Sequence, residues 1–391
     1  MQAGTTIFEH MSGLARAHGA VNLGQGFPDF GWSDAVLAAG AEAITTGYNQ
    51  YPPMRGLPEL RSAVCVFYAR TQGLALDPAQ VIITSGATEA LAASIMAVAG
   101  AGDEVILFAP AYDAYAPLVR RAGAVPVFVD LVPPDWQASR AAIAGAITPA
   151  TRAILINTPH NPTGAVAGAA MLQAIADLAR AHDLIIISDE VWEAVILGSA
   201  PHVSLFGLAP ERTIKVGSAG KLLALTGWKV GWVIAAPELA ERAAQVHQFL
   251  TFTTPPPLQV AVAAGLALPD SWFAAARAQF VRARDRLVAA LTAGGWALLP
   301  SDGSYFVMAD LAASGIAMAD REFCEAAVIS IAQGGGGVAA IPLGAFMPDG
   351  RATPYIRLCF AKSDEVLNDG AARLNAVRLR WQQSPGLAAG E

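Results

Sequence analysis

Residues 153–190 read AILINTPHNPTGAVAGAAMLQAIADLARAHDLIIISDE, and they contain two short apolar runs separated by a stretch rich in alanine and leucine. The runs, at 153–157 and 184–188, are nearly continuous rather than alternating, which is typical of strands buried on both faces of a sheet. The stretch between them, at 165–181, has the length and composition of a helix. A strand, a helix and a strand in series predict a right-handed crossover between parallel strands.

The same alternation extends in both directions from this unit. Further runs of strand length, most of them separated by helix-like stretches such as 88–99 and 237–250, occur at 81–84, 104–108, 125–129, 213–217 and 230–235. Seven such runs predict an α/β fold with a mostly parallel seven-stranded sheet and helices on both faces. Ligands of these sheets bind beyond the carboxyl ends of the strands, so functional side chains are expected directly after the runs.

The composition of the 391-residue chain excludes several classes of protein. Hydrophobic residues make up 54%, the net charge is -7, and Lys and Arg form no cluster, which argues against a nucleic-acid-binding face. The apolar stretch at 90–102 is shorter than the about 20 residues of a membrane span, and the N-terminus has no signal-peptide pattern. Cys65, Cys324 and Cys359 are widely spaced, as buried free thiols in a reducing compartment are. We therefore expect a soluble cytoplasmic protein.

Changes in sequence character predict three parts of the chain. Residues 1–45 form an N-terminal arm with the Gly- and Pro-rich active-site loop at 22–29, and this arm is expected to pack with the small domain. Residues 46–271 form the large domain. A long amphipathic helix at 271–291 opens a small α+β domain at 272–391. Strand-like pieces of this domain lie at 304–308, 338–341 and 355–360, and a flexible glycine joint lies at 334–337.

A segment of small residues, Ser85-Gly86-Ala87-Thr88-Glu89, opens the helix after the run at 81–84. The backbone N–H groups at such a helix start face outward and favour an anion such as a phosphate. The same residues also suit an ordinary helix cap formed by Ser85 or Thr88. The segment therefore predicts either a phosphate site or a plain helix start.

Two polar residues follow the apolar runs of the quoted stretch. Asn161 lies in Thr158-Pro-His-Asn-Pro-Thr-Gly164, whose prolines and glycine hold its amide at the edge of the sheet. Asp189 directly follows apolar residues, and burial of a carboxylate is costly unless a cation pairs with it. That cation belongs either to an internal salt bridge or to a bound ligand.

Lys221 follows the run at 213–217 and stands among apolar and small residues. Burial lowers the pKa of a lysine, as a Schiff-base lysine requires. The chain has no nucleophile elbow, no set of residues with metal-ligand spacing, and no third glycine after Gly24 and Gly26 for a dinucleotide loop. A buried lysine, a strand-end carboxylate, a rigid amide and an anion-binding helix start together fit pyridoxal 5′-phosphate.

The sequence resembles the class I and II aminotransferases of fold type I, in particular the branch with kynurenine aminotransferase, glutamine transaminase K and bacterial methionine aminotransferase. The motifs that carry the resemblance follow the family's order over nearly the whole chain. They are NLGQGFPDF (22–30), NQYPPMRG (49–56), ITSGATEAL (83–91), PAYDAYAP (110–117), NTPHNPTG (157–164), SDE (188–190), SAGK (218–221), TGWKVGW (226–232), VHQFLTF (246–252), AAIPLGAF (339–346) and IRLCFAK (356–362).

The resemblance implies an enzyme that uses pyridoxal 5′-phosphate to move the amino group of an L-amino acid to a 2-oxo acid by a ping-pong mechanism. It implies that Lys221 forms the aldimine and then moves a proton between the substrate α-carbon and the cofactor. Asp189 is then the partner of the pyridinium nitrogen and Asn161 that of the phenolic oxygen, while Tyr112 stacks on the ring. The residues implied to hold the phosphate are Gly86, Ala87, Ser218, Lys229 and, from the other subunit, Tyr51.

The resemblance also implies a homodimer whose subunits share their active sites. Arg357 is the implied partner of the substrate α-carboxylate, assisted by Asn161 and by the backbone N–H of Gly26. Phe252 and Thr253 are implied to line the side-chain pocket from the partner subunit. No metal, nucleic acid or membrane enters this interpretation.

One position departs from the family's pattern. Family members have a tyrosine three residues after the strand-end aspartate, and its hydroxyl donates to the phenolic oxygen of the cofactor. Here the residue is Trp192. An indole N–H can donate but not accept, and its reach differs from that of a phenol. Either the hydrogen bond is lost or remade, or Trp192 only packs beside the cofactor.

The substrate is inferred from the side chains near the implied pocket. No second arginine can be assigned to a dicarboxylate, whereas Tyr112, Phe252, Phe27 and Tyr305 are candidate pocket aromatics. We therefore expect an apolar, sulfur-containing or aromatic (kynurenine-like) amino acid, or glutamine, as the donor.

Other functions are weighed against this one. The enzymatic alternatives are transamination of N-succinyldiaminopimelate, whose enzymes share GQGFPD and PHNPTG, and β-elimination at a cysteine conjugate. A transcription regulator needs an attached winged-helix region, and none is expected before the active-site loop. A purely structural role does not explain why Lys221, Asp189, Asn161 and Arg357 occur together.

Overall fold

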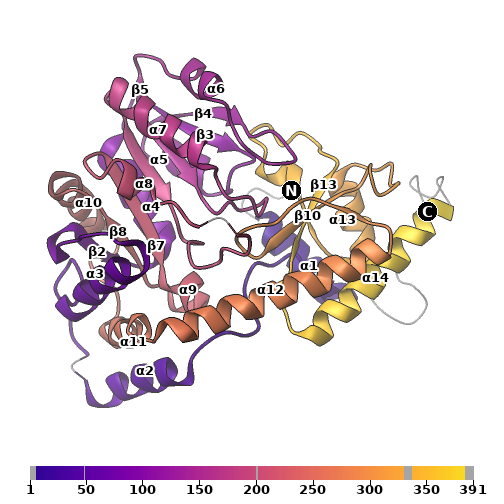
Figure 1. Ribbon diagram of the computed structural model, residues 1–391, viewed down its shortest axis with the longest axis horizontal. Coiled ribbons are helices and arrows are strands. Elements are labelled where there is room, and N and C mark those ends of the chain that lie inside the picture. Colours follow the sequence, from indigo (N-terminus) through magenta and orange to yellow (C-terminus); the bar gives the residue numbers. More distant parts are fainter. Residues whose placement is uncertain (1–5, 48, 200, 330–336, 384–391) are drawn as a thin grey trace.

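A seven-stranded sheet organises the larger part of the chain, which the computed structural model describes over residues 6–47, 49–199, 201–329 and 337–383 (Figure 1). Its strand order is β2-β8-β7-β6-β5-β3-β4. Neighbouring strands are parallel except β8, which is antiparallel to both β2 and β7. The strands are β2 (Val81–Thr84), β3 (Glu104–Ala109), β4 (Val125–Asp130), β5 (Thr151–Asn157), β6 (Ile185–Asp189), β7 (Thr213–Ser218) and β8 (Gly231–Ile234). The predicted fold class is confirmed.

The register of the sheet brings the polar strand ends to one edge. Asn157 at the end of β5 pairs with Asp189 at the end of β6, and Asp189 pairs with Val216 of β7. Ser218, the last residue of β7, pairs with Gly231, the first residue of β8. The residues expected to carry function therefore emerge side by side.

Both faces of this sheet are covered, because neighbouring residues of one strand enter different cores. Ile82 of β2 and Val233 of β8 belong to the larger core, whereas Ile83 and Trp232 belong to a second core. α4 packs on α10 and α5, α7 on α6 and α8, and α11 on α3. The helices around the sheet are α3 (Pro58–Gln72), α4 (Gly86–Val98), α5 (Tyr115–Arg121), α6 (Arg140–Gly145), α7 (Ala169–Ala181), α8 (Leu205–Leu208), α9 (Ala219–Leu222), α10 (Pro237–Leu250) and α11 (Pro256–Leu266).

A long helix, α12 (Asp270–Ala293), leads from the large sheet to a smaller one and lies along α14 (Asp364–Gln383), as Figure 1 shows. The smaller sheet has four antiparallel strands in the order β12-β13-β10-β9. These are β9 (Ala297–Leu298), β10 (Phe306–Asp310), β12 (Ile341–Pro342) and β13 (Tyr355–Cys359). Helix α13 (Asp320–Ile329) packs against β12 and β13. Arg357 lies in the middle of β13, opposite Met308 of β10.

The N-terminal segment contacts both parts of the molecule. Helix α1 (Ile7–His18) packs against α13 and β11 (Val338–Ala339), whereas α2 (Asp34–Thr46) packs against α11. The expected active-site loop begins with the two-residue strand β1 (Val21–Asn22), which pairs with β11, and the rest of it is a loop. The division of the chain at residues 45 and 271 stays a prediction. The glycine joint lies outside the described residues except for Gly337.

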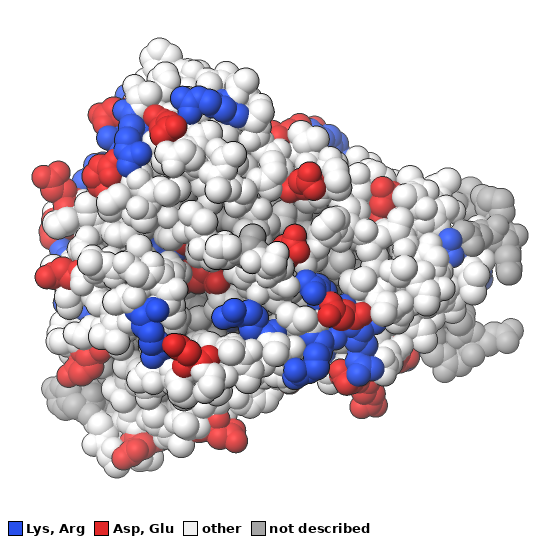
Figure 2. All heavy atoms as spheres, viewed as in Figure 1, with Lys and Arg blue, Asp and Glu red and all other residues white. Residues whose placement is uncertain are grey.

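The surface and the helices bear on the classes of partner considered above. In Figure 2, basic and acidic side chains lie in small groups separated by wide uncharged areas. Among the described residues, no single helix has the length and apolar character to cross a membrane, although α11 and α12, which meet at 93°, pass that test as a bent pair. Cys65, Cys324 and Cys359 are free and buried, as predicted.

Candidate active site

A pocket with about 740 Å³ of open space lies where the strands of the large sheet end. Every residue expected to bind the cofactor lines this pocket except Tyr51. Those residues lie at or after the ends of five different strands, β2, β3, β5, β6 and β7. For example, Gly86 and Ala87 begin α4 directly after β2, whereas Lys229 lies between β7 and β8. The lining residues with chemical function are Gly86, Ala87, Tyr112, Tyr115, Asn157, Asn161, Asp189, Trp192, Ser218, Lys221 and Lys229.

Lys221 projects from the one-turn helix α9 that follows β7. Its Nζ donates to the hydroxyl of Tyr305 at 3.1 Å and lies 4.6 Å from the centre of the Trp192 ring. Burial lowers the pKa of Lys221 to about 8. At pH 7 roughly a tenth of this amine is therefore uncharged, and an uncharged amine can act as nucleophile and as base.

Asp189 ends β6 and is 4% exposed. The Tyr115 hydroxyl donates to its Oδ2 at 2.6 Å and the Val191 N–H to its Oδ1 at 3.3 Å. Burial raises the pKa of Asp189 to about 6, and these two hydrogen bonds oppose the rise only in part. Within the described residues Asp189 forms no ion pair, so the site offers a buried carboxylate to a cationic N–H of a ligand.

The turn after β5 holds Asn161 through its backbone. The Asn161 N–H donates to Asn157 Oδ1 at 2.8 Å, and Asn157 Nδ2 donates to the Asp189 carbonyl at 2.9 Å. Arg357 donates from Nη1 to Asn161 Oδ1 at 2.7 Å. Because the amide oxygen is used by Arg357, the Nδ2 group of Asn161 is left to donate into the pocket.

Arg357 is 1% exposed and lies among aromatic rings. Its guanidinium carbon is 3.9 Å from the centre of the Phe306 ring, and Nη2 donates to the Gly24 carbonyl at 2.7 Å. Burial lowers the pKa of Arg357 to about 10, so the group stays cationic at neutral pH. Its buried Nε has no hydrogen-bond partner among the described residues, and a carboxylate would supply one.

The start of α4 has the features of an anion site. Gly86 has a φ of +77°, and a Cβ at this position would lie 3.2 Å from Lys229 Cε and Nζ. A Cβ at Gly231 would lie 2.7 Å from the carbonyl carbon of Gly86, so the two glycines allow this close approach. The Lys229 side chain forms no ion pair within the described part of the chain. The helix N–H groups, the Ser218 hydroxyl and the Lys229 ammonium fit a phosphate.

These features together pass a test of fit for pyridoxal 5′-phosphate. The pocket supplies an amine with a lowered pKa, a buried carboxylate without a cation, an amide with a fixed donor and a helix start beside a lysine. Each matches one group of that cofactor: the aldehyde, the ring nitrogen, the phenolic oxygen and the phosphate.

Five expected residues are not among those that line this pocket: Tyr51, Gly26, Phe252, Thr253 and Arg357, of which Arg357 binds the lining residue Asn161. Tyr51 is 82% exposed and contacts Phe252, which is 40% exposed, with ring centres 5.6 Å apart. The hydroxyl of Thr253 is buried and lacks a partner among the described residues. These residues do not complete the pocket of their own chain, and their assignment to a partner's pocket stays a prediction. Gly26 also stays a predicted substrate contact; its carbonyl accepts from Tyr305.

Sequence reasoning missed Tyr115 and Asn157, and it gave Tyr305 a different role from the one that the structure shows. Tyr115 binds Asp189, Asn157 positions Asn161, and Tyr305 contacts Lys221 through its hydroxyl. Asn157 ends a predicted strand, and that position was a usable signal. Tyr305 was expected in the substrate side-chain pocket, but nothing near it in the sequence indicates a contact with Lys221, which is 84 residues away.

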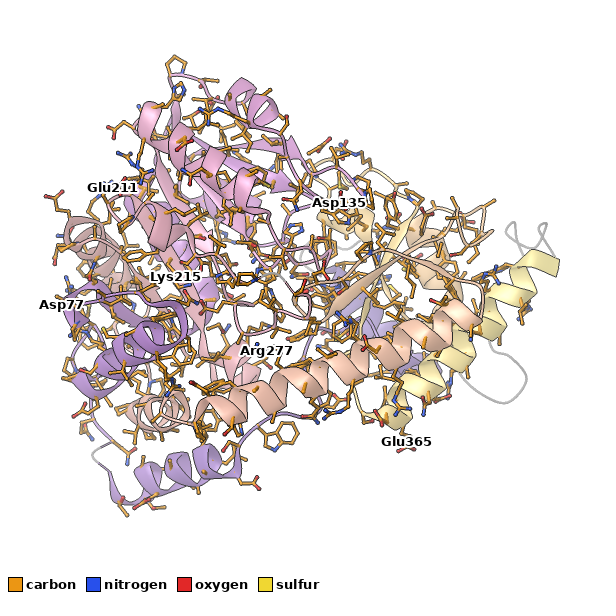
Figure 3. The ribbon with its side chains drawn as sticks, viewed as in Figure 1. Asp77, Asp135, Glu211, Lys215, Arg277 and Glu365 are labelled. Carbon is orange, nitrogen blue, oxygen red and sulfur yellow. The ribbon has the colours of Figure 1, made fainter. Side chains whose placement is uncertain are left out.

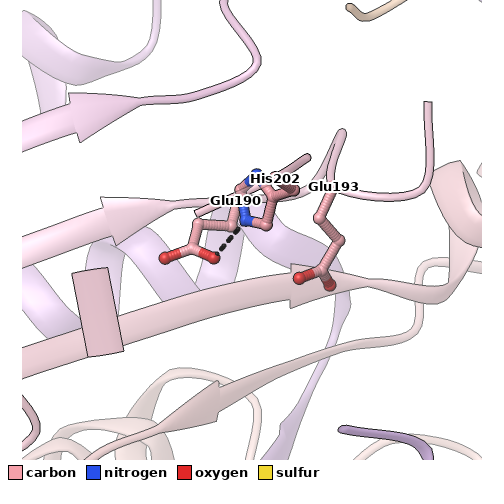
Figure 4. Close-up of side chains that lie close together, drawn as sticks. All are labelled: Glu190, Glu193 and His202. Carbon is pink, nitrogen blue, oxygen red and sulfur yellow. Dashed lines mark hydrogen bonds and ion pairs between the residues drawn. The ribbon is translucent and has the colours of Figure 1, made fainter. Parts of the chain in front are cut away.

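Glu190, next to Asp189, belongs to a buried ionic network. Figure 3 shows Lys215 in the interior, and its ammonium pairs with both Glu190 and Glu193. His202 binds Glu190 at 2.7 Å, as drawn in Figure 4. Although burial raises the pKa of Glu190, Lys215 and His202 outweigh it and lower that pKa to about 2. Glu190, Glu193 and His202 have the grouping of metal ligands, but the Lys215 ammonium already pairs with both carboxylates.

Comparison with known families and proteins gives one consistent result. The family model for aminotransferase class I and II matches residues 19–374. The chain is 42% identical to a probable N-succinyldiaminopimelate aminotransferase of Mycobacterium tuberculosis, over 96% of this chain and 97% of that protein. It is 38% identical to the methionine aminotransferase of Escherichia coli, with the same shares covered, and 33% identical to kynurenine–oxoglutarate transaminase 1 of Rattus norvegicus, with 95% and 94% covered.

Solved structures agree with this result. The N-succinyldiaminopimelate aminotransferase of Mycobacterium tuberculosis has a TM-score of 0.91 to this chain, at 42% identity and with 96% and 97% of the two chains covered. A variant of the aspartate aminotransferase of Thermus thermophilus has a TM-score of 0.87 at 31% identity, with the same shares covered.

Proposed function

The chain belongs to the class I and II aminotransferases, and we propose that its amino donor is an L-amino acid with an apolar, sulfur-containing or aromatic side chain, or glutamine. The enzyme is an aminotransferase that depends on pyridoxal 5′-phosphate and transfers an amino group to a 2-oxo acid. The observation that carries the residue assignments is the convergence of Lys221, Asp189 and Asn161 on one pocket.

The cofactor, when bound, supplies an aldehyde that exchanges amines and a ring that withdraws electrons from the substrate α-carbon. In our proposal Asp189 accepts a hydrogen bond from the ring nitrogen and keeps that nitrogen protonated. Asn161 Nδ2 donates to the phenolic oxygen, and Tyr112 stacks on the ring. Gly86, Ala87, Ser218 and Lys229 hold the phosphate. These roles are supported by the shared pocket and by the orientation that Arg357 gives to the Asn161 amide.

Lys221 moves the proton in this proposal. Its ε-amine would take a proton from the substrate α-carbon and later give that proton up, so the same atom would be base and then acid. A lysine with its ordinary pKa would be almost wholly protonated at neutral pH, and the lowered pKa of about 8 supports the role. Arg357 holds the substrate α-carboxylate in place during this transfer.

The substrate class is proposed from the cations near the pocket. Arg357 is assigned to the α-carboxylate and Lys229 to the phosphate. Lys362 Nζ donates to the Phe27 carbonyl at 2.8 Å and pairs with Asp29 at 3.1 Å. None of these three cations is left for a second carboxylate, whereas Phe27 and Tyr112 supply aromatic surface. An apolar or aromatic side chain fits these surroundings better than aspartate.

N-succinyldiaminopimelate is a second candidate substrate, favoured by the 42% identity to the protein named for that reaction. β-Elimination at a cysteine conjugate remains an alternative reaction of the same site. A panel of amino donors with several 2-oxo acids separates these candidates. We expect methionine, glutamine or an aromatic amino acid to give the highest kcat/KM. A clear preference for aspartate or for N-succinyldiaminopimelate would contradict the substrate proposal.

We further propose a cytoplasmic homodimer. The exposed pair Tyr51 and Phe252, together with the exposed Phe249, supports a dimer, because large exposed aromatic side chains mark interfaces. The free thiols of the buried cysteines fit a reducing compartment. In this proposal Tyr51 and Phe252 complete the partner's pocket, so activity should fall on dilution as dimers dissociate. A monomer with full activity at working concentration would contradict it.

The assignment of the reactive amine has a direct test, because the chain has four lysines, at 215, 221, 229 and 362. Borohydride reduction of the loaded enzyme, followed by peptide mapping, should place the cofactor on Lys221. Lys221→Ala should abolish turnover while cofactor still binds without a covalent bond. Reduction onto another lysine would overturn the assignment.

A further inference from the structure

Tyr305 is a fully buried tyrosine whose hydroxyl makes two hydrogen bonds. It donates to the Gly26 carbonyl at 2.9 Å, and Lys221 Nζ lies 3.1 Å from the same oxygen. Gly26 belongs to the loop at 22–29, and Lys221 belongs to α9. One hydroxyl therefore joins the loop of the N-terminal arm to the reactive amine.

The position of Tyr305 is fixed from several sides. Ser304, the residue before it, has a φ of +56°, which is uncommon for a residue other than glycine. This turn sets the direction of the Tyr305 side chain. The Tyr305 ring packs edge-on against Trp192, with ring centres 4.2 Å apart, and stacks on Phe280 at 6.0 Å. The hydroxyl consequently has little freedom to move away from Lys221.

The direction of each hydrogen bond follows from the donors available. A tyrosine hydroxyl has one hydrogen, and here the Gly26 carbonyl can only accept it. Burial raises the pKa of Tyr305 well above its usual value, so the hydroxyl keeps this hydrogen. The oxygen lone pairs therefore remain for an N–H of Lys221.

We propose that Tyr305 is a positioning residue for Lys221: its hydroxyl, held by the Gly26 carbonyl, accepts an N–H of the ε-amine and sets the direction of the amine's lone pair. The proposal rests on Lys221 being the reactive amine. A base that must reach one carbon atom works only when its lone pair points there. The loop at 22–29 enters the same arrangement because it holds the hydroxyl.

Trp192 makes this contribution of Tyr305 necessary. The indole packs against the Tyr305 ring, with its own ring centre 4.6 Å from Nζ, and it offers a π face but no oxygen. An acceptor for Lys221 next to this ring must come from another element. Tyr305, the residue directly before β10, supplies this acceptor.

The test uses Tyr305→Phe, which removes the hydroxyl and keeps the ring. In cofactor-free protein, trace acetylation at a series of pH values, with mass spectrometry of the Lys221 peptide, reports the pKa of Lys221. Loss of an acceptor disfavours the ammonium, so this pKa should fall by about one and labelling at pH 7 should rise roughly fivefold. In the loaded enzyme, kcat should fall roughly 10- to 100-fold with KM nearly unchanged.

Tyr355→Phe is the matched control, because Tyr355 lies in the same small sheet and packs on Trp136. It should leave the labelling curve and kcat at wild-type values. A Tyr305→Phe enzyme with an unmoved labelling curve and kcat within twofold of wild type overturns the proposal. If borohydride marks another lysine, the assigned role of Lys221 fails first, so the two failures are distinguishable.

A second measurement covers a Tyr305→Phe chain that does not fold. Growth on 3-fluorotyrosine weakens the hydroxyl as an acceptor and leaves the packing in place, and Tyr305 is the tyrosine bonded to Lys221 in the described chain. The labelling pKa of Lys221 should then fall by a few tenths. An unchanged value overturns the proposal.

Discussion

Arg357 Nη1 and Asn161 Oδ1 are 2.7 Å apart, and this hydrogen bond joins the small antiparallel sheet to the turn after β5 of the large sheet. It orients two groups at once. The Asn161 amide turns its Nδ2 toward the pocket, and the guanidinium is fixed for a carboxylate. A substrate held by Arg357 is thereby placed relative to a ring held by Asn161.

Arg357→Lys should lower the activity of the enzyme, because it disrupts the pairing of Arg357 with Asn161. A lysine keeps the charge but cannot hold Asn161 and a carboxylate with one planar group. We expect kcat/KM for the amino donor to fall roughly 30- to 150-fold, which corresponds to about 2–3 kcal/mol. Arg351→Lys is the control, since Arg351 pairs with Asp130 at the surface. Steady-state kinetics within threefold of wild type for Arg357→Lys would contradict this role.

Asp189→Asn should stabilise the cofactor-free protein and weaken cofactor binding. The pKa of Asp189 is about 6 when folded and 3.8 in its ordinary state, so between these values the folded chain binds more protons than the unfolded chain. Stability therefore falls as pH rises from about 4 to about 6, and the loss is complete above that range.

The expected gain for Asp189→Asn at pH 7 is roughly 3 kcal/mol in the free energy of unfolding. The difference from wild type should vanish below about pH 4. Denaturant unfolding of both proteins at pH 4 and pH 7 measures it, and cofactor titration measures the weaker binding. An asparagine variant that is less stable than wild type at pH 7 would show that the Tyr115 hydrogen bond outweighs the cost of burial.

Lys215→Met should destabilise the fold strongly. The ammonium is fully buried between Glu190 and Glu193, and its removal leaves carboxylates without a cation. Breaking a buried pair in this way costs roughly 3–5 kcal/mol. Adding Glu193→Gln to Lys215→Met should recover part of that loss, because one buried charge disappears. Thermal unfolding of the cofactor-free proteins gives the comparison, and a change below 1 kcal/mol for Lys215→Met would contradict the network's role.

Trp192→Tyr should change the titration of the bound cofactor. A hydroxyl at this position gives the phenolic oxygen a further donor, and one neutral hydrogen bond contributes about 0.5–1.5 kcal/mol. The pKa read from the cofactor absorbance should therefore fall by about one. A modest loss of stability accompanies it, since a smaller ring replaces a buried indole.

The control for this titration is Trp296→Tyr, because Trp296 packs on Phe323 in the smaller part of the molecule. It should leave the titration of the bound cofactor unmoved. An unchanged titration in a Trp192→Tyr enzyme that binds cofactor normally would mean that the indole already donates to the phenolic oxygen.

The large sheet was predictable because most of its strands are buried on both faces. The run at 81–84 has three apolar residues followed by Thr84, and β2 matches it residue for residue. The run at 338–341 was expected as one piece, but it is divided into β11, which pairs with β1, and β12, which pairs with β13. The local sequence pattern of a strand does not show which distant strand it pairs with.

The same limit divides the site residues into those that the sequence predicts and those that it does not. Asp189, Asn161 and Lys221 follow strands, and the carboxyl edge of a parallel sheet gathers such residues without further information. Tyr305 reaches Lys221 from the smaller part of the molecule, and Tyr115 reaches Asp189 from the first turn of α5. Their positions depend on how separate elements pack, which no single segment encodes.

The ionic network beside Asp189 also bears on how this sequence can diverge. A change at Lys215 alone leaves two buried carboxylates without this cation, whereas a change at one glutamate leaves the ammonium paired with the other. A joint replacement of all three by apolar residues of similar volume removes the cost. Descendants of this chain should therefore lose Lys215 only together with its glutamates, and intermediates that lack Lys215 alone should be rare. The sequence around the end of β6, which presents Asp189, should therefore change slowly.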